Sequence, residues 1–212
     1  MHPFQKIGHR LRISPLVLPA LLCALAAGCA TRAAPLSLYD FGPLHPAAAA
    51  SASAGKAPAA LALAAVQAPA ALSSQQMLYR LSYVSDLQTR SYAGSRWSMA
   101  PAQLLEQRIK ARLAQAGTVV LSGSEGANTL PTLRIEVDEM IQNFSAPNRS
   151  AAQLALRATL FDGRTLLAQK SFRRQAAAGS ADAAGGAQAM AGASDALIDE
   201  MIAWLADFPL KK

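Results

Sequence analysis

Apolar and charged side chains alternate over residues 133–138, where every second residue is apolar. This pattern predicts a strand with one buried face and one solvated face. A second strand is predicted over 152–161, and Asp162-Gly163 joins it to a third over 164–173. Asp-Gly between two alternating runs favours a two-residue hairpin, because such a turn needs positive φ at both central positions. The pattern therefore predicts an antiparallel hairpin in this part of the chain.

Shorter strands are predicted upstream from apolar runs that end at turn-forming residues. They cover residues 36–42, 61–68, 77–83, 91–92 and 118–121, of which the last is expected to be buried. Gly42-Pro43 ends the first of these strands and Pro69 ends the second.

A first amphipathic helix is predicted from Pro101, a residue favoured in the first helical turn, to the residue before Gly117. Leu105, Ile109 and Leu113 follow one another at four-residue spacing, with charged residues opposite them. This spacing places the three apolar side chains on one buried stripe.

A second helix is predicted over about residues 187–208, after a loose loop of small residues over 176–186. Its bulky apolar residues gather on one side, so we expect it to pack on the sheet. The predicted fold class is α/β (α+β), a single domain in which two amphipathic helices pack on a mixed, largely antiparallel sheet.

The amino terminus is typical of an export signal, with a basic start, an apolar run over 16–27 and small residues before Cys29. The sequence before Cys29 matches a lipobox, except that Ala26 stands where leucine is usual. The alternative is an uncleaved membrane helix, but the run is shorter than the ~20 apolar residues of a span, and Pro15 and Pro19 interrupt it. We therefore expect cleavage before Cys29 and lipidation of its thiol.

Three regions follow from these patterns: a signal peptide over 1–28, a lipidated segment with a short strand and a flexible Ala-rich loop over 29–59, and a folded domain over 60–212. Ala30 follows the cysteine, where aspartate would retain a lipoprotein on the inner membrane in the enterobacterial sorting rule. The expected location is the outer membrane, with the inner membrane as the alternative. A lipid anchor of several acyl chains is nearly permanent.

Charge and residue usage narrow the function. Loss of Lys6, Arg10 and Arg12 with the signal peptide lowers the basic residues from 20 to 17, against 13 acidic ones, so the formal charge falls from +7 to +4. A charge this small and scattered permits contact with anionic lipid but does not favour nucleic acid. The cysteines are Cys23 and Cys29, and the histidines are His2, His9 and His45. Residues 60–212 therefore contain no His-based triad, Cys nucleophile or usual zinc site.

Glu136 and Asp138 are the candidates for acid chemistry, because residues two apart in a strand project from the same face. They could bind a hard cation, but Arg134 shares that face, as expected for the solvated side of an amphipathic strand. The chain also lacks a G-x-S-x-G elbow and a phosphate-binding glycine loop. We expect no catalytic residue, no metal and no cofactor.

Four aromatic residues border the first helix: Tyr79, Tyr83, Tyr92 and Trp97. Aromatic side chains with polar tips are enriched at interfaces, so these are the candidate residues for contact with lipid or a partner protein. Packing in the core or at an edge is the alternative. An exposed aromatic patch would also suit a symmetric homo-oligomer.

Several segments together resemble the ABC-type transport auxiliary lipoproteins, which include the paraquat-inducible lipoprotein C type. They are the lipobox that ends at Cys29, residues 38–43, residues 77–80, residues 92–97 before the Pro101 helix, and residues 196–199. They are spread over most of the mature chain. The Ala-rich segment 47–60 departs from the family pattern.

The resemblance implies an outer-membrane-side lipoprotein of a transporter that moves lipids through the periplasm. The implied partners are an inner-membrane ATPase and permease and a substrate-binding protein of the MCE (mammalian cell entry) type. The domain itself would be a docking or assembly subunit rather than an enzyme. Two alternatives stay open: a lipoprotein for lipopolysaccharide or envelope assembly, and an envelope hydrolase that uses carboxylates.

Overall fold

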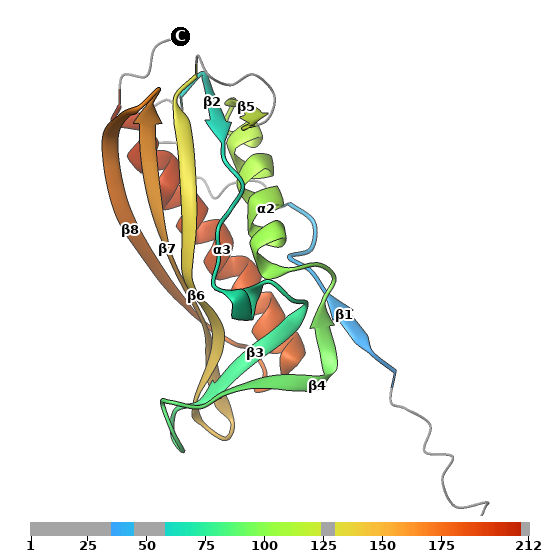
Figure 1. Cartoon of the computed structure of the whole chain (residues 1–212). Coiled ribbons are helices and arrows are strands. Elements are labelled where there is room, and N and C mark those ends of the chain that lie inside the picture. The colour runs from blue at the N-terminus through green and yellow to red at the C-terminus, as the bar shows by residue number, and fades with distance from the viewer. Residues whose placement is uncertain (1–34, 45–57, 124–129, 209–212) are drawn as a thin grey trace, which may run out of the picture. The chain divides into compact units, whose positions relative to one another are not determined.

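The longest strand, β6 (Thr132–Ala146), lies at the centre of the sheet. Strand β7 (Arg149–Asp162) pairs with it in antiparallel fashion, and β8 (Thr165–Ala177) pairs with β7 in the same way. The structure is a computed structural model that describes residues 35–44, 58–123 and 130–208 (Figure 1). The helices and strands of these described residues lie in the unit Leu36–Lys212.

The other edge of β6 is shared between two short parallel strands. β2 (Ala60–Leu63) pairs with the start of β6, and β3 (Gln76–Leu81) pairs with its end. β5 (Val119–Ser122) adds to β2 in parallel. Beyond β3 follow β4 (Thr89–Trp97), antiparallel, and then β1 (Ser37–Tyr39), parallel to β4. Among the described residues this makes an open mixed sheet of eight strands, in which the longest ladders are antiparallel.

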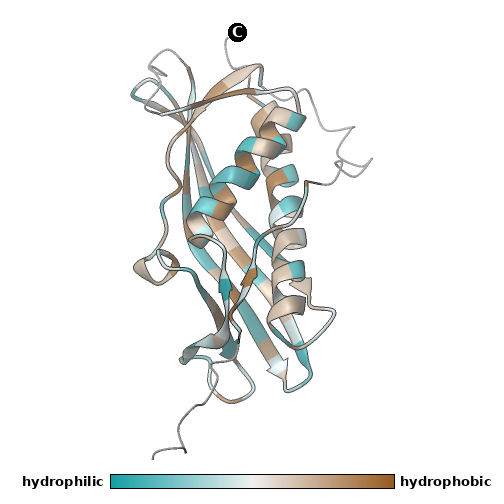
Figure 2. Cartoon of the chain, turned by 90° about the vertical axis from the view of Figure 1, so that its right-hand side faces the viewer, coloured by the Kyte–Doolittle hydropathy of each residue, from teal (hydrophilic) through white to brown (hydrophobic). Residues whose placement is uncertain are grey.

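Helices α2 (Pro101–Gln115) and α3 (Ala183–Ala206) lie on one face of the sheet (Figure 2). A 3-10 turn, η3 (Ala70–Leu72), follows β2. The predicted stripe of α2 is confirmed, since Leu105, Ile109 and Leu113 are fully buried. Helix α3 packs on β7 and β8, where the ring of Trp204 meets that of Phe172 edge-on at 5.7 Å. The predicted class, a mixed sheet with two amphipathic helices, is confirmed.

The two helices differ from the sequence prediction in their charged residues and their limits. Arg108 and Arg112 of α2 are buried beside the apolar stripe, although charged residues were expected on the far side. Helix α3 begins at Ala183 and β8 continues to Ala177, so the predicted loop over 176–186 is only five residues long. Small alanine and glycine side chains fit a helix or a loop equally well by hydropathy, which is why the pattern missed this boundary.

The strand limits also need correction. β6 runs well beyond residue 138, to Ala146. The sequence pattern missed this second half because a bulge between Val137 and Glu139 shifts the alternation by one residue. β5 is an edge strand with Val119 exposed, so the expected buried strand there is wrong. β1 and β2 are found where strands were predicted, but they are shorter.

The hairpin between β7 and β8 is confirmed, with a different turn from the one expected. Asp162 pairs with Thr165, so the two central residues are Gly163 and Arg164. Only Gly163 has a positive φ, at 58°. Positive φ at the first central position alone is the pattern of a type II′ turn.

Candidate functional site

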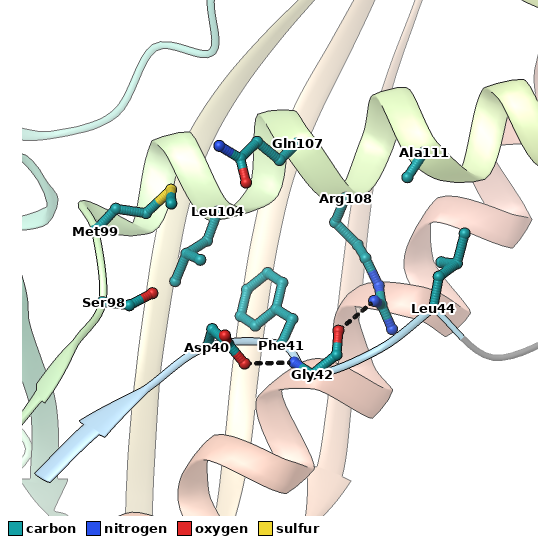
Figure 3. A pocket seen from close by; sticks show the side chains of 10 residues that line it. All are labelled: Asp40, Phe41, Gly42, Leu44, Ser98, Met99, Leu104, Gln107, Arg108 and Ala111. Atoms are coloured by element: carbon teal, nitrogen blue, oxygen red, sulfur yellow. Dashed lines mark hydrogen bonds between the residues drawn. The ribbon is translucent and has the colours of Figure 1, made fainter.

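The segment that follows β1 lies between the two helices and is held at both ends. The Asp40 carboxylate accepts a hydrogen bond from the Gly42 amide at 2.7 Å, and the positive φ of Gly42, 64°, closes this turn. Phe41 is buried against Trp97, with the ring centroids 5.8 Å apart. Arg108 Nη1 donates to the carbonyl oxygen of Gly42 at 3.1 Å (Figure 3). Helix α2 thus fixes the Gly42 end of the segment.

Arg108 also joins α2 to α3. Its Nε and Nη2 donate to the two carboxylate oxygens of Asp195, each at 2.6 Å. One turn further along, Arg112 Nη2 donates to Asp199 at 2.8 Å. Bidentate arginine–carboxylate pairs are short and directional, and leaving one member buried alone is costly. These pairs therefore fix the position of the two helices against each other.

Two cavities flank the segment after β1. One of about 280 Å³ lies on the α2 side, between Phe41, Leu104 and Arg108 (Figure 3). The other, of about 620 Å³, lies between β1 and the first half of α3, and we call it the β1–α3 groove. Its α3 wall consists mostly of small residues at helical spacing: Ala184, Ala187, Gln188, Ala191, Gly192 and Asp195. The groove is therefore wide, mostly apolar along α3, and polar where Arg108 meets Asp195.

Strand β1 is an edge strand beside this groove. It pairs with β4 on one side, where Tyr39 accepts a hydrogen bond from the Ser98 amide at 2.7 Å. Alternate residues of a parallel strand bond to the same neighbour, so the N–H and C=O of Leu38 point away from β4. Within the described part of the chain no other strand pairs with β1, and its second edge is open.

The four candidate aromatic residues do not form one cluster. Tyr79 and Tyr92 lie on neighbouring strands with ring centroids 4.7 Å apart, and both are half-buried. Trp97 is only 5% exposed and packs in the core, as in the alternative interpretation. Tyr83 lies apart, in the turn between β3 and β4, and is 45% exposed. Of the four, Tyr83 presents the most surface to a partner or a membrane.

Tyr92 belongs to a buried hydrogen-bond network rather than to an exposed patch. Its hydroxyl donates to Gln142 Oε1 at 3.0 Å, and Gln142 Nε2 donates to Ser150 Oγ and to the carbonyl of Asp182. Burial, and to a lesser extent the nearby Tyr79 and Asp182, raise the pKa of Tyr92 to about 12. The hydroxyl therefore stays protonated at neutral pH and acts as a structural donor.

Glu136 and Asp138 lie on the face of the sheet that the helices leave open. Both pair with Arg157 of β7, at 3.2 and 3.3 Å, and both side chains are about half exposed. In the described residues, no three His, Cys, Asp or Glu side chains gather as a metal site would require. The carboxylates have the surroundings expected of a solvated strand face.

Cys29, His45 and most of the Ala-rich segment lie outside the described residues. Neither described helix has the length and unbroken apolar character needed to cross a membrane.

The β1–α3 groove was not predicted. A signal for its polar end exists in the sequence, because Arg108 stands one turn after Leu104 and next to Ile109, on the buried side of α2. Small residues on α3 carry no comparable signal.

Comparison with known proteins gives a family and a fold. A family model described as "ABC-type transport auxiliary lipoprotein component" matches residues 39–202. No curated protein matches the sequence. A crystal structure of a Xanthomonas campestris protein is similar with a TM-score of 0.68 and 18% identity, over 79% of this chain and 93% of that one. Another crystal structure, of an uncharacterised protein, has a TM-score of 0.61 and 17% identity, over 80% and 97%. At these identities the structures support the fold alone.

Proposed function

The chain belongs to the family of ABC-type transport auxiliary lipoprotein components, and we propose that it is the outer-membrane-side docking subunit of an ABC/MCE-type lipid transport system. In this proposal the partners are an MCE-family substrate-binding protein and the permease and ATPase of the same system. The domain itself performs no reaction. The domain serves lipid trafficking and membrane integrity by holding the periplasm-spanning part of the transporter at the outer membrane.

Lipid on Cys29 supplies the tether in this proposal. An anchor of several acyl chains confines the domain to the periplasmic face of the outer membrane. Confinement raises the effective concentration of the docking site near a partner that spans the periplasm, without any additional contact.

The β1–α3 groove is the observation that carries the docking role. It offers about 620 Å³ between a helix wall of small residues and the open-edged strand β1. An extended peptide that lies beside β1 in this groove gains main-chain hydrogen bonds from the open edge at Leu38. The side chains of the peptide then occupy the space over Ala187 and Gly192. The occupant we propose is therefore an extended terminal segment of the MCE-type partner.

Gly192 provides the test, because a Cβ at this position meets nothing within 4 Å. Gly192→Leu places a bulky side chain in the groove from a Cβ that has open space around it, and leucine has better helix propensity than glycine. We expect the full-length lipoprotein with Gly192→Leu to fold normally and to lose co-purification of the MCE-type protein from detergent-solubilised envelopes.

Two matched variants control this experiment. Gly192→Ala adds one methyl group at the same position, and Ala196→Leu introduces the same leucine side chain at an exposed site of α3 outside the groove lining. Both are expected to retain the partner. Undiminished capture by Gly192→Leu would remove the groove from the proposal. Capture of no MCE-type protein by the unaltered chain, with normal envelope resistance to detergent after deletion of the gene, would overturn the function itself.

A further inference from the structure

Three apolar side chains project from the turn between β3 and β4, residues 82–88, which we call the β3–β4 tip. Leu87 is 97% exposed, Val84 is 62% exposed and Tyr83 is 45% exposed. Large apolar residues occur singly on most protein surfaces, but a group at one turn marks a contact surface. We propose that the β3–β4 tip inserts these side chains into the interface of the membrane that carries the lipid anchor. This inference rests on the proposed anchor at Cys29.

Hydrogen bonds order the backbone of the β3–β4 tip, so its apolar side chains stay directed outward. The amides of Val84 and Ser85 both donate to the Leu81 carbonyl at 2.9 Å. Ser82 donates to the Phe144 carbonyl through its amide and through its hydroxyl, each at 2.9 Å. These bonds tie the tip to the end of β6. Because the turn is already ordered, burying the Leu87 side chain in lipid costs little further conformational entropy.

Cationic side chains flank the tip. Arg90 is exposed just after the tip, and its Nη2 donates a hydrogen bond to Gln88 Oε1 at 2.7 Å. Arg149 is exposed at the start of β7, beside the turn that joins it to β6. Asp86 is the acidic residue of the tip itself. Arginine side chains around an apolar tip can reach lipid phosphates while the apolar groups enter the acyl boundary.

A lipid surface fits this tip better than a protein partner does. Stable protein interfaces bury roughly 800 Å² on each partner, in a broad and well-packed area. Three side chains on a narrow turn offer far less surface. A bilayer interface needs no matching shape, and the tether already holds the domain beside it.

The chain length between the anchor and β1 brings the tip within reach of the membrane. Seven residue steps separate Cys29 from Leu36, which span at most ~25 Å. Ser37 pairs with Ser95, and the six steps of β4 from Thr89 to Ser95 cover ~20 Å. The start of β1 and the tip are therefore close enough to meet one membrane surface. The β7–β8 turn is at the far end of β7, ~43 Å along the strand.

The mature chain is suited to a single-site probe, because Cys29 is its sole cysteine and is acylated in the proposed form. Leu87→Cys then introduces one free thiol for an environment-sensitive fluorophore. The control is Leu166→Cys, an exposed leucine beside the β7–β8 turn. Both full-length lipidated variants are reconstituted in vesicles of phosphatidylethanolamine and phosphatidylglycerol that carry nitroxide-labelled lipid. We expect a blue shift and several-fold stronger quenching at Leu87 than at Leu166.

Equal quenching at the two sites would overturn the inference. Protection of the Leu87 probe that appears only when an MCE-type protein is added would also overturn it and would make the tip a protein contact. The anchor is tested separately by the intact mass of the mature chain, which reports acylation whatever the tip does. A Leu87→Glu variant whose intact mass shows the same acylation, and in which a probe at Val84→Cys is quenched less, would support the membrane contact.

Discussion

At the residue scale, Gln142 shows how one buried amide organises several elements. Its side chain bonds to Tyr92 of β4, Ser150 of β7 and the carbonyl of Asp182, just before α3. A buried polar group is tolerated when its donors and acceptors are paired. Because the amide lies against the first turn of α3, it also dictates which residue the helix can place there.

Gly186 is the residue that this packing requires. A Cβ at Gly186 would collide with the Gln142 side chain, whereas a Cβ at Gly192 meets open space. We expect Gly186→Ala to lower the free energy of unfolding by ~1–3 kcal/mol through overpacking. Gly192→Ala is expected to raise it by up to ~1 kcal/mol through helix propensity. Urea unfolding measures both, and equal effects of the two substitutions would contradict the assigned contact.

Asp182 gives α3 a pH-dependent start. Its carboxylate accepts from the Gly185 amide at 2.8 Å, and this bond, with that from Ser180, lowers the pKa of Asp182 below its ordinary value. The folded state therefore favours the charged form, so the stabilisation is present above the unfolded pKa of about 4 and is lost as the pH falls through the folded pKa.

The corresponding prediction concerns Asp182→Ala, which removes the N-cap. We expect it to lower the free energy of unfolding by ~1 kcal/mol at pH 7. The difference from the unaltered chain should shrink as the pH falls below about 4, because protonation weakens the same bonds. Asp182→Asn keeps an acceptor oxygen and should cost less at neutral pH. A difference that stays constant through this range would mean that the charge is not involved.

At the element scale, sequence periodicity located most elements and failed where the period changes. Residues 133, 135 and 137 of β6 face the helices, but after the bulge the inward positions become 140, 142 and 144. A search for strict alternation therefore stopped at residue 138. Each half of the strand is regular, and only pairing with β7 reveals that they are one element.

The contacts between α2 and α3 set a similar limit on what the sequence alone can predict. The aliphatic stripe of α2 was predictable because it recurs every fourth residue, while the burial of Arg108 depends on Asp195, 87 residues away. Ion pairs between distant segments leave no periodic signal. The β1–α3 groove depends on the same tertiary packing, so it too could not be predicted from the sequence. The predicted amino-terminal export signal, by contrast, depends on a local pattern alone.

Arg108 allows a test of how firmly the helices are joined. Arg108→Met is expected to lower the free energy of unfolding by ~3 kcal/mol, because the Asp195 carboxylate loses its bidentate partner in a largely buried position. The loss is limited by Arg112 Nε, which lies 3.7 Å from Asp195. Adding Asp195→Leu should restore part of the stability, since the double variant buries no unpaired carboxylate there. Additive losses in urea unfolding would contradict this coupling.

At the scale of the whole molecule, folding and attachment are separate properties. The described elements and the buried core lie in the unit Leu36–Lys212, whereas the proposed lipid site, Cys29, precedes that unit. Changes at Cys29 should therefore alter where the domain is held without altering its stability. This separation allows docking and tethering to be measured independently.

A form in which a signal peptide that is cleaved without lipidation replaces residues 1–29 tests the tether with the groove intact, because Cys29→Ala alone would also remove the lipobox on which the expected cleavage depends. We expect the variant to leave the membrane fraction and to keep its urea unfolding midpoint. Its affinity for the purified MCE-type partner in solution should be that of the unaltered β1–α3 groove. Envelope resistance to detergent should nevertheless fall towards that of the deletion strain, because a freely diffusing domain loses the effective concentration that the anchor provides. Raising expression of the soluble variant should recover part of the resistance, since concentration then replaces tethering. Full resistance at normal expression would mean that the anchor is dispensable, and no recovery at any expression level would mean that the membrane position itself is required.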